Sequence, residues 1–539
     1  MYKVFLKIPF LLFITAISVF AINPDSLKKI TCELASDKML GRGTGQKGEV
    51  LAAEYIAAKF SEHGLIKPAG LTDYYQYVPL HGSTPKESSQ LKLFRGDGTF
   101  RLNIHKDYVP VSYGDPTFIP DTIEIVFAGY GISAPEYDYD DYHFLDVENK
   151  VVVVLGGEPL SDNETFFDGR NLTHYSLIEN KRKTALARGA TGLIFIPNLA
   201  DFDVFNWEKL SDLYSSEYVR LASEVSSSFS IILNPVNSHL IFSGSDYSYE
   251  TILSLHKNGN MTSFPLKTSL SFKGKFEERD FLGINVIGML EGSDDDLKDE
   301  YVLVTAHYDH LGYDSINNGV KIFNGALDNA IGVAGMLEII RDLSVSRSNK
   351  RSIIFAAVTA EEKGLLGSVY YTQNPPYLLY KTVANVNIDG LCFIDTLKSL
   401  IGIGADKSEL NEIFTGFLKD NELKPGILPD YFENTEAFAR SDQYAFARAG
   451  IPSALLYEGL DFKNVSPEKA LNIITDYMIN RYHTPLDICD ETINFSAAAF
   501  HAALIKDFLL RVAEYDGEIK WLPGNYYEIA RLRNKAEKR

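Results

Sequence analysis

Apolar runs alternate with helical segments along the C-terminal half of the chain. The runs are NVIGML (285–290), YVLVTA (301–306), SIIFAAVTA (352–360), TVANVNID (382–389) and SLIGIG (399–404). Each has the length and composition of a strand that is buried on both faces. A helix is predicted from Leu327 to about Leu343, between the second and third runs. This alternation predicts an α/β fold in which helices sandwich a mostly parallel mixed sheet.

The earlier part of the chain has a different pattern. A helix with apolar positions such as Val50, Leu51 and Tyr55 is predicted before Gly64. From 117 to 272, two apolar strands and a helix, turn and strand in TALARGATGLIFI predict a β-rich α/β domain. We therefore expect one discontinuous domain (22–116 and 273–515), an inserted domain (117–272) and a C-terminal tail (516–539). A chain of 539 residues is long enough for two such cores.

The first 21 residues have the pattern of a secretory signal peptide. Lys3 and Lys7 precede an apolar run from Ile8 to Phe20, and the small residue Ala21 is a plausible cleavage point. The alternative, a single membrane anchor, is disfavoured because the run is shorter than the roughly 20 residues that span a bilayer. The pattern predicts a secreted or periplasmic protein whose mature chain has no stable membrane insertion.

Composition narrows the function classes. A hydrophobic content of 45% excludes a disordered chain, and 52 basic against 72 acidic residues give a net charge of −20, which argues against a nucleic-acid partner. Three cysteines (Cys32, Cys392 and Cys489) are too few for a disulfide scaffold. A bridge between Cys392 and Cys489 remains an alternative, but buried thiols are the preferred interpretation.

Acidic and histidine side chains occur at or just after the predicted strand ends. They are His307, Asp309, Asp328, Glu361, Glu362, Asp389 and His483. Strand ends of a parallel sheet meet at one edge, where so many charges would be uncompensated unless a cation neutralised them. A pair of zinc ions needs a bridging carboxylate and at least two further ligands on each ion. Two histidines and three acids meet that requirement, so the sequence predicts two Zn²⁺ ions as cofactors.

Five ordered motifs resemble those of the co-catalytic dizinc aminopeptidases, the family of the bacterial leucyl aminopeptidases and the glutamate carboxypeptidase II group. The motifs are TAHYDHLG, FNGALDNAIGVAGMLE, FAAVTAEEKGLLGS, NVNIDG and YHTP. The run from Phe127 to Pro159 resembles the protease-associated domain that is inserted in some of these enzymes.

The resemblance implies a zinc exopeptidase fold and a role for each site residue. Asp328 would bridge the metals, with Glu362 and His483 at one ion and His307 and Asp389 at the other. Glu361 would be the general base. Asp309 would orient the imidazole of His307.

Two further positions near the motifs do not belong to the predicted ligand set. Gln443 stands where many relatives have histidine, so we expect local substrate contacts that differ from those of the family. His310 receives no role because a solvated loop histidine is the simpler interpretation.

The resulting hypothesis is a secreted dizinc metallopeptidase that removes N-terminal residues from peptides. The alternatives are another dizinc exopeptidase (a carboxypeptidase or dipeptidase), a single-zinc acyltransferase similar to glutaminyl cyclase, and a non-enzymatic receptor of the transferrin receptor type. The inserted domain argues against the cyclase, and the complete ligand set argues against the receptor. The sequence leaves the preferred residue and the oligomeric state open.

Overall fold

The computed structural model describes residues 22–536, except 72, 97, 113–116, 164, 170–171, 202–204, 215–216, 226–227, 317–318 and 429–436. The predicted signal peptide (1–21) lies outside the described residues. Within them, no helix combines the length and the apolar character that crossing a membrane requires.

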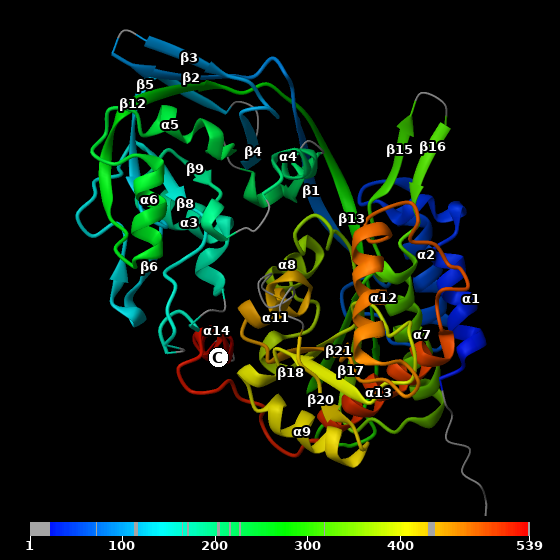
Figure 1. The fold of residues 1–539 in the computed structure, drawn as a ribbon. Coiled ribbons are helices and arrows are strands. Elements are labelled where there is room, and N and C mark those ends of the chain that lie inside the picture. The colour runs from blue at the N-terminus through cyan, green and yellow to red at the C-terminus, as the bar shows by residue number, and fades with distance from the viewer. Residues whose placement is uncertain are drawn as a thin grey trace, which may run out of the picture.

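Two sheets organise the described part of the chain (Figure 1). The larger one has the order β10-β1-β13-β17-β14-β18-β21-β19-β20. Its strands are β1 (Tyr75–Pro85), β10 (Tyr218–Leu221), β13 (Phe276–Leu290), β14 (Tyr301–His307), β17 (Ser352–Val358), β18 (Thr382–Asn387), β19 (Ser399–Ile403), β20 (Lys424–Pro425) and β21 (Ser453–Glu458). The central run β17-β14-β18-β21 is parallel, whereas β10, β1 and β13 on one side are antiparallel. The sheet is therefore mixed, and it is parallel mainly at its centre.

Helices cover both faces of the larger sheet, as the apolar runs predict. They are α1 (Pro24–Leu34), α2 (Lys47–Glu62), α7 (Ile331–Ser346), α8 (Leu366–Gln373), α9 (Leu410–Asp420), α11 (Gln443–Arg448), α12 (Pro467–Asn480) and α13 (Phe495–Glu514). The main core lies between the sheet and α1, α2, α7 and α13. On the opposite face, Tyr371 of α8 and Phe446 of α11 pack against Ile287, Leu303 and Ile354. Helix α7 starts at Ile331, four residues later than predicted, because an irregular turn occupies 326–330.

The second sheet has the order β3-β2-β12-β5-β8-β9-β11-β4 and its own core. Its strands are β2 (Gln90–Arg95), β3 (Gly98–Leu102), β4 (Tyr108–Ser112), β5 (Phe118–Ala128), β8 (Val151–Leu155), β9 (Gly192–Ile196), β11 (Phe229–Leu233) and β12 (Ser263–Lys273). Helices α3 (Ile178–Ala187), α4 (Trp207–Leu213), α5 (Ser238–Ile241) and α6 (Tyr249–Lys257) accompany it. Two short strands, β6 (Ser133–Ala134) and β7 (Tyr139–Asp140), pair with each other.

The second sheet does not coincide with the predicted insertion. Strands β2 to β4 precede residue 117, whereas β10 lies inside 117–272 but pairs with β1 of the larger sheet. The long strand β13 runs between the two parts of the molecule (Figure 1). The division into domains stays a prediction, and the strands show which residues each sheet contains.

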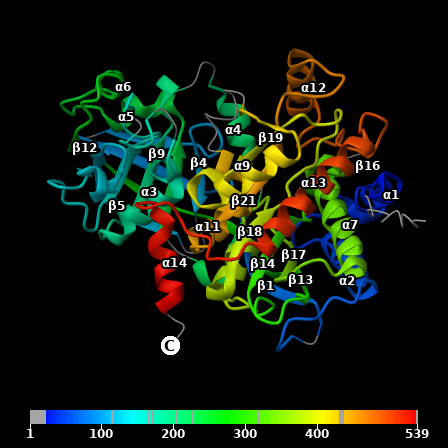
Figure 2. The ribbon, with the colours of Figure 1, turned by 90° about the horizontal axis from the view of Figure 1, so that it is seen from below.

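The predicted tail is folded against the rest of the chain. Helix α14 (Tyr526–Ala536) places Tyr527 beside Tyr444 and Trp521. The ring of Tyr526 lies 4.3 Å from that of His174. Figure 2 shows α14 beside α3 and α11, so the C-terminal helix contacts both parts of the molecule.

A separate two-stranded hairpin follows β14. It consists of β15 (Gly312–Ile316) and β16 (Gly319–Phe323). It connects the residues that follow His307 to the turn that contains Asp328. His307 and Asp328 are both predicted metal ligands.

Candidate metal centre

The carboxyl ends of three neighbouring parallel strands bring predicted ligands together. His307 is the last residue of β14 and pairs with Val358, the last residue of β17. Glu361 follows Val358 by three residues. Thr305 pairs with Asn387, two residues before Asp389. The structure therefore places these residues at or just after the carboxyl ends of neighbouring strands, as predicted.

The first group of candidate ligands consists of His307, Asp328 and Asp389, whose ligand atoms lie within 4.8 Å of one another. Nε2 of His307 is 3.3 Å from Oδ1 of Asp328 and 3.3 Å from Oδ1 of Asp389. Nδ1 of His307 donates a hydrogen bond to the backbone carbonyl of Asp309 (3.2 Å). This bond selects the tautomer whose Nε2 lone pair faces the two carboxylates.

The second group consists of His310, Asp328, Glu362 and His483. Nε2 of His483 is 3.2 Å from Oδ2 of Asp328 and 3.2 Å from Oε2 of Glu362. This Nε2 atom is buried and lacks a well-aligned hydrogen bond to any described residue. A buried nitrogen between two carboxylates without such a bond suits a metal ligand. Asp328 belongs to both groups and turns a different oxygen to each.

The carboxylates make this cluster attractive to cations. Burial would lower the pKa of His483, but the carboxylates of Asp328 and Glu362 beside its Nε2 raise it to about 10. Burial also opposes protonation of His307, whose pKa is nevertheless well above its usual range because of Glu361, Asp328 and Asp389. The surrounding acids thus stabilise positive charge at both histidines, as they would stabilise a bound metal ion.

Glu361 lies beside the first group. It lines a cavity of about 170 Å³ together with His307, Asp328 and Asp389. Burial is the largest cause that raises the pKa of Glu361 well above its usual value. A carboxyl group that faces the cavity and can hold a proton is suited to acid–base chemistry.

Asp309 contacts the site differently from the expectation. Its Oδ1 is 3.9 Å from Nδ1 of His307, which is too long for a hydrogen bond. The carboxylate instead accepts hydrogen bonds from the backbone N–H of Glu361 (3.1 Å) and the hydroxyl of Thr44 (3.0 Å). Asp309 orients His307 through its own carbonyl and holds the backbone of Glu361 through its side chain.

His310 is not a solvated loop histidine. Its side chain is completely buried, because the segment around Gly43 pairs with it and covers the loop. Nδ1 of His310 lies 2.6 Å from Oε1 of Glu362, and its ring lies edge-on to that of His483. The position of His310 inside TAHYDHLG, next to Asp309, is the signal that could have indicated this role.

Two buried residues that the sequence did not indicate hold the ligand loops. Asp487 accepts hydrogen bonds from the backbone N–H groups of Leu327 and Asp328 at 3.1 to 3.2 Å. Arg42 donates to backbone carbonyls of four residues: Leu34, Tyr308, Asn324 and Gly325. Asp487 follows His483 by four residues, whereas no sequence pattern marks Arg42.

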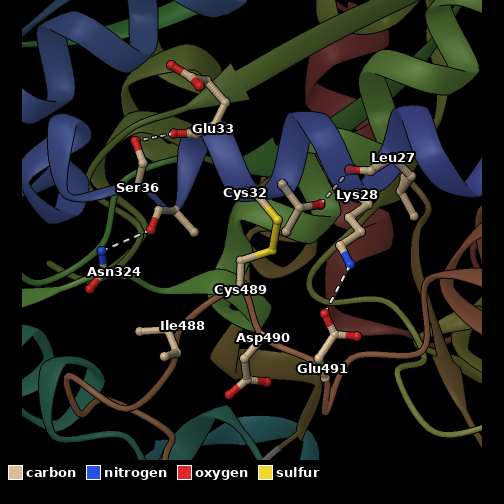
Figure 3. Close-up of a disulfide and its surroundings, with 12 residues drawn as sticks. Leu27, Lys28, Cys32, Glu33, Ser36, Asn324, Ile488, Cys489, Asp490 and Glu491 are labelled. Carbon is tan, nitrogen blue, oxygen red and sulfur yellow. Dashed lines mark hydrogen bonds and ion pairs between the residues drawn. A yellow bond between two sulfur atoms is a disulfide. The ribbon is translucent and has the colours of Figure 1, made fainter.

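A disulfide joins Cys32 of α1 to Cys489 (Figure 3). The Cys392–Cys489 bridge that the sequence left as an alternative is therefore wrong, and so is the interpretation of Cys489 as a buried free thiol. Cys392 is free and buried. The bridge spans 457 residues of sequence, so local spacing could not reveal it. It fixes the segment after His483 to the N-terminal helix.

Gln443 lies in the interior. Its side chain accepts a hydrogen bond from Asn387 (2.9 Å) and donates one to the carbonyl of Phe438 (2.9 Å). The side chain of Gln443 is completely buried and belongs to this hydrogen-bond network, so it stabilises the interior next to β18.

Comparison with known proteins relates the region of the site to zinc peptidases. Residues 285–509 match the model of peptidase family M28. A probable zinc metalloprotease of Pyricularia oryzae is 34% identical over 123 residues, which cover 23% of this chain and 22% of that protein. Aminopeptidase Y of Saccharomyces cerevisiae is 26% identical over 211 residues, 38% of this chain and 34% of that protein. The aligned region thus spans about a fifth to a third of these relatives.

A solved structure has the same fold across most of the chain. The aminopeptidase from Aneurinibacillus sp. strain AM-1 aligns with 94% of this chain and 97% of its own length, at 19% identity and a TM-score of 0.51. The expected zinc exopeptidase fold is confirmed.

Proposed function

We propose that this chain, in which residues 285–509 match peptidase family M28, is a secreted two-zinc aminopeptidase. The supporting observation is the pair of ligand groups that share Asp328. Peptide would be the substrate.

The distances within the two groups suit zinc. Ligands 2.0 to 2.1 Å from a tetrahedral zinc ion lie about 3.3 Å from one another. The four nitrogen–oxygen distances at His307 and His483 are 3.2 to 3.3 Å. This agreement supports one ion held by His307, Asp328 and Asp389, and a second held by Asp328, Glu362 and His483.

Glu361 is the proposed general base. Bound zinc ions would polarise the scissile carbonyl and lower the pKa of the attacking water. The Glu361 carboxylate would accept a proton from that water and deliver it to the leaving amine. Asp309 supports this role because it holds the backbone N–H of Glu361.

Other assignments complete the proposal. The Cys32–Cys489 disulfide is compatible with the oxidising compartment that residues 1–21 would direct the chain to. Residues 117–272 would form a protease-associated domain. Removal of N-terminal residues is preferred over other exopeptidase reactions because the related proteins include aminopeptidases.

The test is hydrolysis of aminoacyl p-nitroanilides by zinc-loaded protein, with and without a chelator. Glu361→Gln should retain zinc and lower turnover about 10²- to 10⁴-fold, because only proton transfer is lost. Glu291→Gln, at an exposed position after β13, is the matched control and should behave like wild type. Release of C-terminal residues alone, or cyclisation of N-terminal glutamine, would replace the aminopeptidase by one of the alternatives.

A further inference from the structure

The cavity beside the metal centre has mostly apolar walls away from the ligands. Its volume is about 170 Å³. The apolar lining residues are Leu327, Leu391, Phe393, Ile403, Leu428, Leu455, Ile474 and Met478. A substrate group bound here would bury hydrocarbon against these side chains.

Glu458 is a carboxyl group in this apolar wall. It is the last residue of β21, it lines the cavity, and only 6% of its surface is exposed. Among the described residues it forms no ion pair, and its one hydrogen bond comes from its own backbone N–H. Burial raises the pKa of Glu458 to about 7.

Among the described residues, the other charged groups of the cavity leave Glu458 without a counter-charge. His307, Asp328, Glu361 and Asp389 belong to the metal centre. Arg440 also lines the cavity, but its side chain is exposed to solvent, where water and salt screen its charge. A buried carboxylate is costly unless a cation or donor accompanies it, so a substrate cation would stabilise this wall.

We propose that Glu458 selects substrates whose N-terminal residue is lysine or arginine. This inference rests on the proposed aminopeptidase function. The methylene groups of such a side chain would pack against the apolar walls while its charged end reaches the Glu458 carboxylate. Leucine or methionine would fill the same walls but leave the carboxyl group without a partner.

Glu458→Gln tests the role of the charge with little change in shape. We compare kcat/KM for lysyl, arginyl, methionyl and leucyl p-nitroanilides with the zinc-loaded enzyme. Wild type should prefer lysyl over methionyl substrate, and the variant should reduce that ratio about 10- to 100-fold, since a charge-assisted hydrogen bond is lost. Glu412→Gln, at an exposed position on α9, is the control and should keep the wild-type ratio.

Two results would overturn the proposal. An equal loss of kcat/KM for all four substrates would mean that Glu458 binds the α-ammonium group that they share. An unchanged lysyl-to-methionyl ratio would mean that Glu458 is a structural residue. Calorimetric binding of lysinamide and norleucinamide to the zinc-loaded protein separates this proposal from the proposed function. If no anilide is cleaved, tighter binding of lysinamide that Glu458→Gln abolishes still supports selection of a cation, whereas equal binding contradicts it.

Discussion

Glu362 has a different partner at each of its carboxylate oxygens. Oε2 is 3.2 Å from Nε2 of His483, and Oε1 is 2.6 Å from Nδ1 of His310. Two atoms bound to one zinc ion would be about 3.3 Å apart, so the shorter distance is that of a hydrogen bond. We infer that His310 positions Glu362 and is not itself a ligand.

Two substitutions of His310 separate these roles. His310→Asn keeps an N–H near the place of Nδ1, whereas His310→Phe removes it. The first should retain zinc, and the second should weaken zinc affinity about 10- to 100-fold, as loss of a ligand's hydrogen-bond partner does. Competition with a chromogenic chelator measures both. Equal affinity in the two variants would show that the hydrogen bond has no role.

At the scale of elements, the disulfide connects α1 with a loop that supports the metal centre. Cys489 follows Asp487 by two residues, and Asp487 holds the backbone N–H of Asp328. Next to the bridge, Lys28 forms an ion pair with Glu491 at 3.4 Å (Figure 3). Loss of the bridge would leave the loop attached by weaker contacts.

Replacing both Cys32 and Cys489 by serine should lower the free energy of unfolding by about 2 to 5 kcal/mol, because the unfolded chain loses a cross-link. Denaturant unfolding of the zinc-loaded protein measures the change. Cys392→Ser is the matched control, since it removes a buried thiol and leaves the bridge intact. A double variant as stable as this control would mean that the bridge does not support the fold.

Sequence patterns were sufficient to predict the strands and the places where they end, but they could not predict contacts between segments that are distant in the sequence. The strands that end at His307 and before Asp389 could be predicted because apolar runs of this length are buried strands. The burial of His310 and the contacts of Arg42 depend on segments more than 260 residues apart. Likewise, β2 to β4 join the second sheet through pairing that no local pattern encodes.

At the scale of the whole molecule, the metal centre depends on residues well before the region that matches family M28. Arg42 is completely buried, and its guanidinium reaches the backbone on both sides of the β15–β16 hairpin, at Tyr308 and at Asn324 and Gly325. It thus connects the loop after His307 to the turn before Asp328. The N-terminal segment is part of the peptidase fold and not an appendage to it.

Arg42→Leu should therefore destabilise the protein by at least about 3 kcal/mol, because it leaves several buried carbonyl groups without donors. Arg533→Leu, at an exposed position on α14, should change stability by less than about 0.5 kcal/mol. Chemical denaturation of both variants gives the difference. Similar stability of the two would contradict the role assigned to Arg42.

The central claim, two zinc ions that share Asp328, is tested most directly by the zinc content of the purified protein. Elemental analysis after reconstitution with zinc and removal of excess metal should give close to two zinc ions per chain, since each ligand group suits one ion. A content of one zinc ion per chain would contradict the shared bridge. A chain that retains no zinc would contradict the metal centre itself.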